Sequence, residues 1–162
     1  MTIAFNMDEI FEMAEQIERN AAKFYQDAAK MASNGAMRKT FGDLSAMEEG
    51  HLRIFQEMRK HLSPEEKEQL TFDPDNQAVS FLQAMADSHG SEGKKSRTEK
   101  LSGKESIREI FEIAVNAEKD SVVFYTAIKG LVNTGSGKDK VETIIDEELG
   151  HLAVLKLELA RL

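Results

Sequence analysis

Cysteine is absent from the 162 residues of this sequence. Disulfide bonds, zinc–thiolate sites and iron–sulfur clusters held by this chain are therefore excluded. The sequence also lacks any apolar run close to the roughly 20 residues that a membrane-spanning helix needs. No basic segment followed by an apolar one stands at the N-terminus, so no secretory signal is predicted. These absences together favour a cytoplasmic protein.

Basic residues are outnumbered by acidic ones. The chain has 21 Lys and Arg against 29 Asp and Glu, which gives a formal net charge of −8. Binding to nucleic acid or to an anionic membrane requires a basic face that attracts phosphate groups. We therefore expect no nucleic-acid partner and no membrane partner.

Proline is scarce, and its two occurrences, Pro64 and Pro74, lie close together. Because proline breaks helices, the segments on either side can form long helices. Apolar residues there recur at helical spacing, as at Ile10, Phe11 and Ala14. We predict four long helices and one crossover, at residues 7–32, 36–61, 103–132 and 138–161, with the crossover at 62–102.

The lengths of the connections predict how these helices are arranged. Short connections make the first two helices, and likewise the last two, antiparallel neighbours. A bundle helix of about 26 residues is about 39 Å long, and the crossover, with short helices starting near Pro64 and Asn76, can run that full length. We therefore predict an all-α four-helix bundle with an up-down-down-up order, formed by one domain over residues 1–162.

Local signals predict where the helices begin and end. Asn6 with Glu9 has the pattern of a capping box at the start of the first helix. Ser102 with Glu105 has the same pattern, and we expect the third helix to start there. The segment 134–137 contains two glycines and is expected to separate the last two helices.

The chain contains an internal repeat with an offset of 100 residues. The first copy has one lone glutamate, one Glu-x-x-His pair and one tyrosine seven residues after the lone glutamate. The second copy has the same residues at the same spacing. The repeated residues are Glu18, Tyr25, Glu48 and His51 in the first copy, and Glu118, Tyr125, Glu148 and His151 in the second.

The repeated residues predict a dinuclear metal site. Glutamate and histidine at i and i+3 lie on one helix face, so both can reach one metal ion. Four glutamates and two histidines are the ligand set of a dimetal centre in a helix bundle. Four buried carboxylates without cations would be very costly, whereas two divalent cations balance them. Mixed oxygen and nitrogen ligands suit iron or manganese better than magnesium, and zinc could also bind.

The sequence also leads to expectations for residues other than the candidate ligands. Tyr25 and Tyr125 have two interpretations: they are either core residues or hydrogen-bond donors to a metal-binding carboxylate. Gly50 and Gly150 suggest a close approach of another backbone. His61 is expected to be exposed at a helix end, and His89 to lie in a loop over residues 89–101. A further set of glutamates is expected at the surface: Glu12, Glu15, Glu49, Glu109, Glu112 and Glu147.

At the repeated residues the chain resembles the ferritin-like diiron-carboxylate proteins, and most closely their rubrerythrin-like branch. The resemblance covers both helix pairs but not the crossover. It implies that Glu48 and Glu148 bridge two iron ions. It also implies that Glu18 and Glu118 are terminal ligands, and that His51 and His151 each bind one iron. Rubrerythrins tend to carry one more glutamate three residues after the ligand of the third helix, where this chain has Ser121.

The resemblance implies an oxidoreductase that reduces hydrogen peroxide or dioxygen in defence against oxidative stress. Rubrerythrins usually carry a rubredoxin domain with four cysteines, and this chain has none, so electrons are expected from a separate donor protein. Two alternatives remain open: a ferroxidase or iron-handling protein, and a non-enzymatic dimetal-binding bundle. We expect a homodimer.

Overall fold

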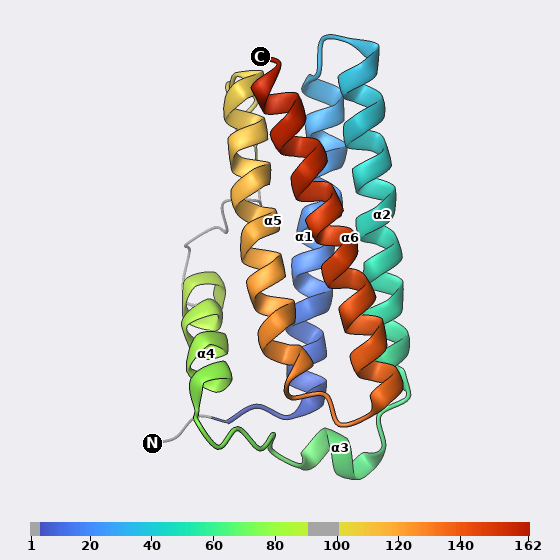
Figure 1. Cartoon of the computed structure of the whole chain (residues 1–162), viewed down its shortest axis with the longest axis vertical. Helices are drawn as coiled ribbons and strands as arrows, with labels where there is room; N and C mark the ends of the chain where they lie inside the picture. Colours follow the sequence, from blue (N-terminus) through green and yellow to red (C-terminus); the bar gives the residue numbers. More distant parts are fainter. Residues whose placement is uncertain (1–3, 91–100) are drawn as a thin grey trace.

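The computed structural model describes residues 4–90 and 101–162, and for residues 86–90 the backbone only. It contains six helices in this described part of the chain (Figure 1). They are α1 (Met7–Met31), α2 (Gly35–Lys60), α3 (Pro64–Glu68), α4 (Gln77–Gly90), α5 (Ile107–Lys129) and α6 (Gly135–Ala160). None of these helices is long and apolar enough to cross a bilayer.

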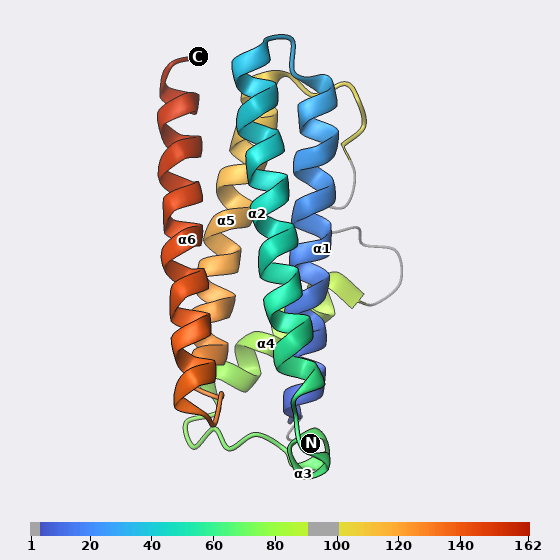
Figure 2. The same cartoon turned by 90° about the vertical axis from the view of Figure 1, so that its right-hand side faces the viewer.

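The four long helices form the predicted bundle. α1 packs against α2 and α5 packs against α6, each pair being antiparallel, and α2 and α5 run in the same direction (Figures 1 and 2). α3 lies across the base of the bundle, and α4 lies along the lower half of α5 (Figure 1). The all-α prediction with two antiparallel pairs and a long crossover is therefore confirmed. Residues 91–100, which include most of the predicted loop 89–101, lie outside the described residues.

The first helix begins at the predicted capping box, but the third does not. Asn6 accepts from the backbone N–H of Glu9 at 2.9 Å, and the Glu9 side chain accepts from the Asn6 N–H at 3.0 Å. Ser102 and Glu105 instead close a separate turn, in which Gly103 has a φ of 84°. This left-handed conformation is incompatible with a helix. α5 therefore starts at residue 107, capped by Ser106.

The last helix begins earlier than predicted. The segment 134–137 was expected to break the helical structure, yet Thr134 is the N-cap of α6 and accepts from the N–H of Gly137 at 3.1 Å. A Cβ on Gly137 would lie 2.7 Å from Thr134 Oγ1 and 2.7 Å from Val132 Cγ1. A glycine in this first turn is thus required by the tight packing of the cap and the preceding loop.

Two apolar clusters fill the bundle on either side of its middle. One contains Phe11, Phe55 and Ile144, and the other contains Phe41 and Phe111. Both clusters are buried and draw residues from both helix pairs. Burial of this apolar area is the main term that stabilises the fold. It also keeps water away from the polar residues that lie between the clusters.

Candidate metal centre

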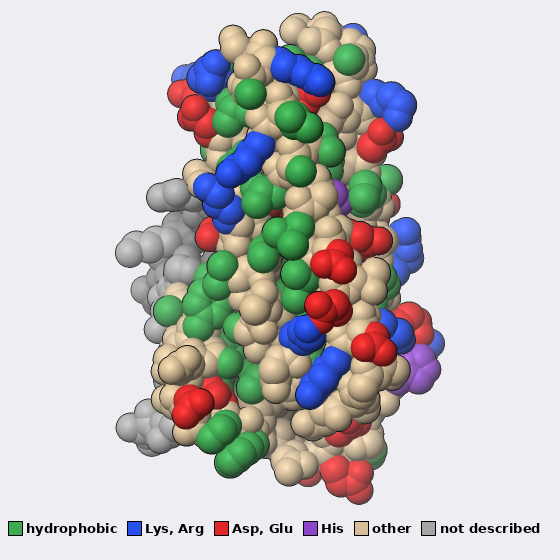
Figure 3. Space-filling model, in the orientation of Figure 1, with side chains coloured by type: hydrophobic (Ala, Val, Ile, Leu, Met, Phe, Trp, Pro, Cys, Tyr) green, Lys and Arg blue, Asp and Glu red, His purple; other side chains and the backbone are tan. Residues whose placement is uncertain are grey.

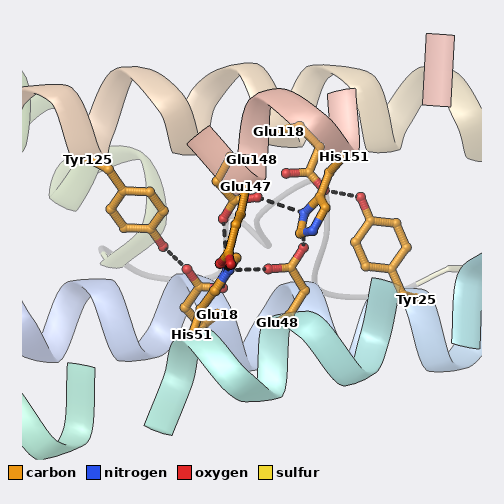
Figure 4. A network of polar contacts seen from close by, with 9 residues as sticks. All are labelled: Glu18, Tyr25, Glu48, His51, Glu118, Tyr125, Glu147, Glu148 and His151. Atoms are coloured by element: carbon orange, nitrogen blue, oxygen red, sulfur yellow. Dashed lines mark hydrogen bonds and ion pairs between the residues drawn. The ribbon is translucent and has the colours of Figure 1, made fainter. Parts of the chain in front are cut away.

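The structure brings all six candidate ligands together in the middle of the bundle (Figure 4). α1 and α5 each contribute one glutamate, and α2 and α6 each contribute one Glu-x-x-His pair. No ligand is more than 3% exposed. The ligands are Glu18, Glu48, His51, Glu118, Glu148 and His151. Helical spacing explains why the six side chains point into the bundle, because each residue lies on the buried face of its helix.

The six residues form two overlapping groups of four. Within each group, one ligand atom from every residue lies within 4.8 Å of the others. Glu48 and Glu148 belong to both groups. Glu18 and His51 complete one group, and this group is hereafter the His51 subsite; Glu118 and His151 complete the other, hereafter the His151 subsite. Two shared carboxylates between two sets of terminal donors are the arrangement of a dinuclear centre.

Both histidines turn Nδ1 toward the carboxylates. His51 Nδ1 lies 3.1 Å from Glu48 Oε2, 3.2 Å from Glu148 Oε1 and 3.6 Å from Glu18 Oε2. His151 Nδ1 lies 2.9 Å from Glu148 and 3.2 Å from Glu48. The ring centroids of the two histidines are 5.6 Å apart, and the rings are nearly parallel. The pseudo-two-fold symmetry of the repeat is therefore kept at the level of ligand atoms.

Each tyrosine hydrogen-bonds to a ligand of the other helix pair. The Tyr25 hydroxyl donates to Glu118, and the Tyr125 hydroxyl donates to Glu18 (Figure 4). Of the two interpretations of these tyrosines, the hydrogen-bond donor is the one observed, although both rings are also fully buried. Burial raises the pKa of both hydroxyls well above its usual range, so they stay protonated and can donate.

Three buried polar atoms of the site have no hydrogen-bond partner in the described part of the chain. They are Glu18 Oε2, Glu48 Oε1 and His151 Nε2. Buried polar atoms without partners cost free energy, and native proteins contain few of them. Both carboxylate oxygens face the other ligands, where a cation would satisfy them. The residues present therefore fit a bound metal ion.

The charge of the site supports the same conclusion. Burial raises the pKa of Glu18 and of Glu118 well above the usual range of a carboxyl group. The carboxylates of Glu48 and Glu148 add to this shift by repulsion. In the absence of cations the site therefore holds protons on its two terminal glutamates. Divalent cations would displace these protons, because metal binding requires deprotonated ligands.

The two shared glutamates are charged because the imidazoles face them. Burial opposes ionisation, but the close contacts with the imidazoles of His151 and His51 outweigh it; they lower the pKa of Glu48 and bring that of Glu148 to about 2. Burial likewise lowers the pKa of His151, yet its contacts with the carboxylates of Glu148 and Glu48 raise it to about 9. The pKa of His51 is raised further for the same reason. Two imidazolium groups thus supply the positive charge that metal ions would otherwise bring.

Glu147 contacts the candidate site, which its place in the sequence did not predict. It was expected at the surface, and its side chain is indeed 45% exposed. Its Oε2 nevertheless lies 2.7 Å from His51 Nε2 and accepts a hydrogen bond from the other side of that ring (Figure 4). A difference within the repeat could have revealed it, because the equivalent residue of the first copy is Met47.

Two expectations about this region are wrong. Glu15 was expected at the surface but is 7% exposed, with its carboxylate 3.5 Å from Arg59 and 3.4 Å from Arg19. Gly50 and Gly150 are not contacted by another backbone, since a Cβ at either position would meet at most the Arg53 side chain at 3.9 Å. The remaining glutamates of that set are exposed as predicted: Glu12, Glu49, Glu109 and Glu112.

Neither of the other two histidines is among the candidate ligands. His61 ends α2 and is exposed, as predicted. The backbone of His89 belongs to α4 rather than to a loop, and its side chain lies outside the described residues. Ser121, which replaces the further glutamate of rubrerythrins, is buried on α5.

Comparisons with known proteins agree with this fold. The sequence model of the rubrerythrin family matches residues 1–59. A crystal structure from Thermotoga maritima, provisionally assigned as a ferritin-like diiron-carboxylate protein, superimposes with a TM-score of 0.71. It is 24% identical in sequence, and the match covers 99% of this chain and 98% of the other.

A hypothetical protein from Pyrococcus furiosus superimposes with a TM-score of 0.69 at 21% identity, covering 96% of this chain and 89% of the other. No curated protein sequence matches the chain. The resemblance inferred from the repeated ligands is thereby confirmed. The comparisons therefore show a ferritin-like fold for this chain, together with a sequence that matches the rubrerythrin family over residues 1–59.

Proposed function

We propose that this protein is a non-haem diiron oxidoreductase that reduces hydrogen peroxide or dioxygen. The observation that supports this proposal best is the pair of overlapping ligand groups that share Glu48 and Glu148. Glu18 and His51 would hold one iron ion, and Glu118 and His151 the other. The match of residues 1–59 to the rubrerythrin family and the likeness to a ferritin-like diiron-carboxylate protein support the choice of iron.

Two ferrous ions held together would supply two electrons, the number needed to reduce peroxide with two protons to two molecules of water. After each turnover the centre would need two electrons back. We propose that a separate electron-donor protein provides them, since the chain has no cysteine with which to hold a redox centre of the rubredoxin type.

The chain's own residues would prepare the site for this chemistry. The two apolar clusters limit the access of bulk water to the six ligands. Tyr25 and Tyr125 hold Glu118 and Glu18 in place from outside the ligand set. Orientation of ligands by such outer hydrogen bonds typically raises metal affinity by about 10–100-fold.

The proposal is tested by loading the protein with ferrous iron anaerobically and mixing it with hydrogen peroxide. We expect a rapid change in near-ultraviolet absorption, much faster than the oxidation of free ferrous iron at the same concentration. The variant E148Q, which removes the charge of a shared ligand, should lose this rate advantage, whereas E49Q on the exposed face of α2 should keep it. Equal oxidation rates for the loaded protein and free iron would overturn the proposal.

The same experiment separates the two alternatives. An iron-handling protein would take up many iron ions per chain after oxidation, while the proposed enzyme should stay at two. A non-enzymatic bundle would bind zinc or manganese as tightly as iron and show no peroxide-dependent absorption change. Metal analysis after gel filtration, carried out before and after repeated additions of iron and peroxide, distinguishes these outcomes.

A further inference from the structure

The two histidines of the centre differ in what they contact on their outer side. The Nε2 of His51 donates to Glu147 at 2.7 Å. The Nε2 of His151 is buried and has no hydrogen-bond partner in the described part of the chain. The residue equivalent to Glu147 in the first copy of the repeat is Met47, which carries no charge and is 42% exposed. This difference breaks the pseudo-two-fold symmetry of the site.

A hydrogen-bond acceptor beside one imidazole nitrogen keeps the proton of the neutral ring on that nitrogen, which leaves the other nitrogen free to bind a metal ion. With Glu147 accepting from Nε2, the proton of a neutral His51 stays on Nε2, and the lone pair of Nδ1 points toward the carboxylates. His151 has no such partner, so nothing holds its Nε2 in the donor form. The contact with Glu147 therefore holds the His51 ring in the orientation that metal binding needs, so that only the proton on Nδ1 has to leave when an ion binds.

We propose that Glu147 is a positioning residue that makes the two metal subsites unequal, so that the His51 subsite binds a divalent cation more tightly and fills first. This inference rests on the metal site of the proposed function but not on its redox chemistry. Outer-sphere carboxylates on metal-binding histidines typically change metal affinity by about 10–100-fold, and we expect a difference of that size between the subsites.

The inference is tested by titrating the metal-free protein with Co²⁺, followed by calorimetry and by the visible absorption of bound Co²⁺. The native protein should bind two ions in two separate steps. In E147M, which copies the residue of the first repeat, the tight step should weaken by about 10-fold or more and approach the second. In M47E, which places a carboxylate at the equivalent position beside His151, the weak step should strengthen.

Variants of the terminal ligands identify which subsite is filled first. E118Q should keep the tight step, because it damages only the His151 subsite, whereas E18Q should lose it. E49Q is the matched control, since it removes an exposed charge next to the other shared glutamate and should leave both steps unchanged. Unchanged thermal unfolding of metal-free E147M would show that the effect is not a general loss of structure.

The possible outcomes separate this inference from the proposed function. Two equal steps in the native protein, or unequal steps that E147M leaves unchanged, would overturn the role of Glu147 while leaving a dinuclear site intact. No binding of Co²⁺ at all would overturn both. Unequal binding combined with slow oxidation by peroxide would support Glu147 and contradict only the redox function.

A second, independent observation concerns the outer face of α6. Large apolar side chains are exposed there: Leu149 is 47% exposed, Val154 43% and Leu157 61%. Ala153 and Ala160, one to two turns away, are exposed as well. Figure 3 shows hydrophobic side chains gathered over the middle of the face formed by α5 and α6. We call the five residues of α6 the outer stripe.

The repeat shows that the fold itself does not require an apolar outer stripe. Four of its positions have equivalents in α2 at the same exposed places, and all four are charged there. The equivalents are Glu49, Arg53, Glu57 and Lys60. Since the bundle tolerates charges at these places on α2, the apolar residues of α6 need an explanation beyond the packing of the single chain.

We propose that the outer stripe binds a second copy of this chain, with the two α6 helices antiparallel about a two-fold axis near Ala153. This register places Leu149 of each copy against Leu157 of the other. It also brings the exposed Asp146 close to Arg161 of the second copy, so that opposite charges flank the apolar contact. The small side chain of Ala153 lets the helices approach closely at the axis.

The dimer is tested by measuring the mass in solution with sedimentation equilibrium. The native protein should be a dimer, and L149E combined with L157E, which copies the residues of α2, should be a monomer with an unchanged circular dichroism spectrum. D146R should weaken the dimer, and adding R161D to it should restore the affinity. F72S, which removes an apolar side chain 85% exposed elsewhere, is the control. A monomeric native protein, or a dimer insensitive to the α6 variants, would overturn the proposal.

Discussion

Tyr25 on α1 donates its hydrogen bond to Glu118 on α5, which belongs to the other half of the repeat, and Tyr125 returns the same contact to Glu18. Each helix pair therefore orients a ligand of the opposite pair. These two contacts connect the halves directly beside the metal centre, where the apolar clusters are interrupted by charged residues. The candidate metal ligands are thus held by the association of the two hairpins and not by either hairpin alone.

Replacing either tyrosine by phenylalanine should weaken one metal subsite selectively. Y25F removes the donor to Glu118 and leaves a buried carboxylate oxygen without its partner, so we expect the His151 subsite to lose about 10-fold or more in Co²⁺ affinity. Y125F should do the same to the His51 subsite. A calorimetric titration measures both, and an equal effect of the two variants on both steps would contradict the crossed contacts.

Neutralising the terminal ligands should remove stabilisation by metal and leave the metal-free protein about as stable as before. In E18Q combined with E118Q, two buried carboxyl groups that hold protons in the metal-free site become neutral amides of the same shape. We expect the free energy of unfolding of the metal-free protein at neutral pH to change by less than about 1 kcal/mol, because no buried charge is removed. Urea unfolding with a chelator present measures this, and added metal should stabilise the native protein but not the variant. A metal-free variant that is much more or much less stable would contradict protonated terminal glutamates.

Replacing two glycines of the long helices by alanine should change the free energy of unfolding in opposite directions. G50A adds a Cβ whose nearest neighbour is an arginine side-chain atom at 3.9 Å, so only the better helix propensity counts. We expect a gain of about 0.5–1 kcal/mol in the free energy of unfolding. G137A adds a Cβ that overlaps Thr134 and Val132 at 2.7 Å and should destabilise the protein by about 1–3 kcal/mol. Thermal and urea unfolding compare the pair, and a destabilised G50A would show a contact that this structure lacks.

The ion pair between Arg59 and Asp8 should contribute to stability in a pH-dependent way. Two hydrogen bonds of 2.9 Å join the guanidinium of α2 to the carboxylate of α1, and both side chains are partly buried, at 27% and 30% exposed. The hydrogen bond from Arg59 is the main reason that the pKa of Asp8 is lowered. A lowered carboxyl pKa stabilises the fold above the unfolded value, about 3.9, and this contribution disappears as the pH falls through the folded value.

R59M tests this prediction, because it keeps an apolar stem and removes the charge. At neutral pH we expect R59M to lower the free energy of unfolding by about 1–2 kcal/mol. This value is reduced because the ion pair is partly exposed, and it includes the loss of one of the two arginines beside buried Glu15. The difference between R59M and the native protein should shrink below about pH 4. A difference that stays constant from neutral to acid pH would show that the loss comes from packing and not from charge.

Helical periodicity and the repeat allowed much of this protein to be predicted from its residues. The spacing of Glu48 and His51 places both on one face of a helix by local geometry alone, and the repeat at Glu148 and His151 makes chance unlikely as its explanation. Two prolines confined to the crossover left room for four long helices. Such properties depend on neighbours along the chain, which the residue order contains in full.

What the residue order could not supply are the contacts between helices that lie far apart along the chain. The partner of Tyr25, the contact of Glu147 with His51 and the burial of Glu15 beside Arg59 depend on how α1, α2, α5 and α6 are rotated and shifted against each other. The start of α5 also depended on the left-handed Gly103, which a capping pattern cannot reveal. Local spacing thus determined which residues could bind metal. Only the packing of the two hairpins decided which outer residues hydrogen-bond to these candidate ligands, and why the two histidines differ in their outer contacts.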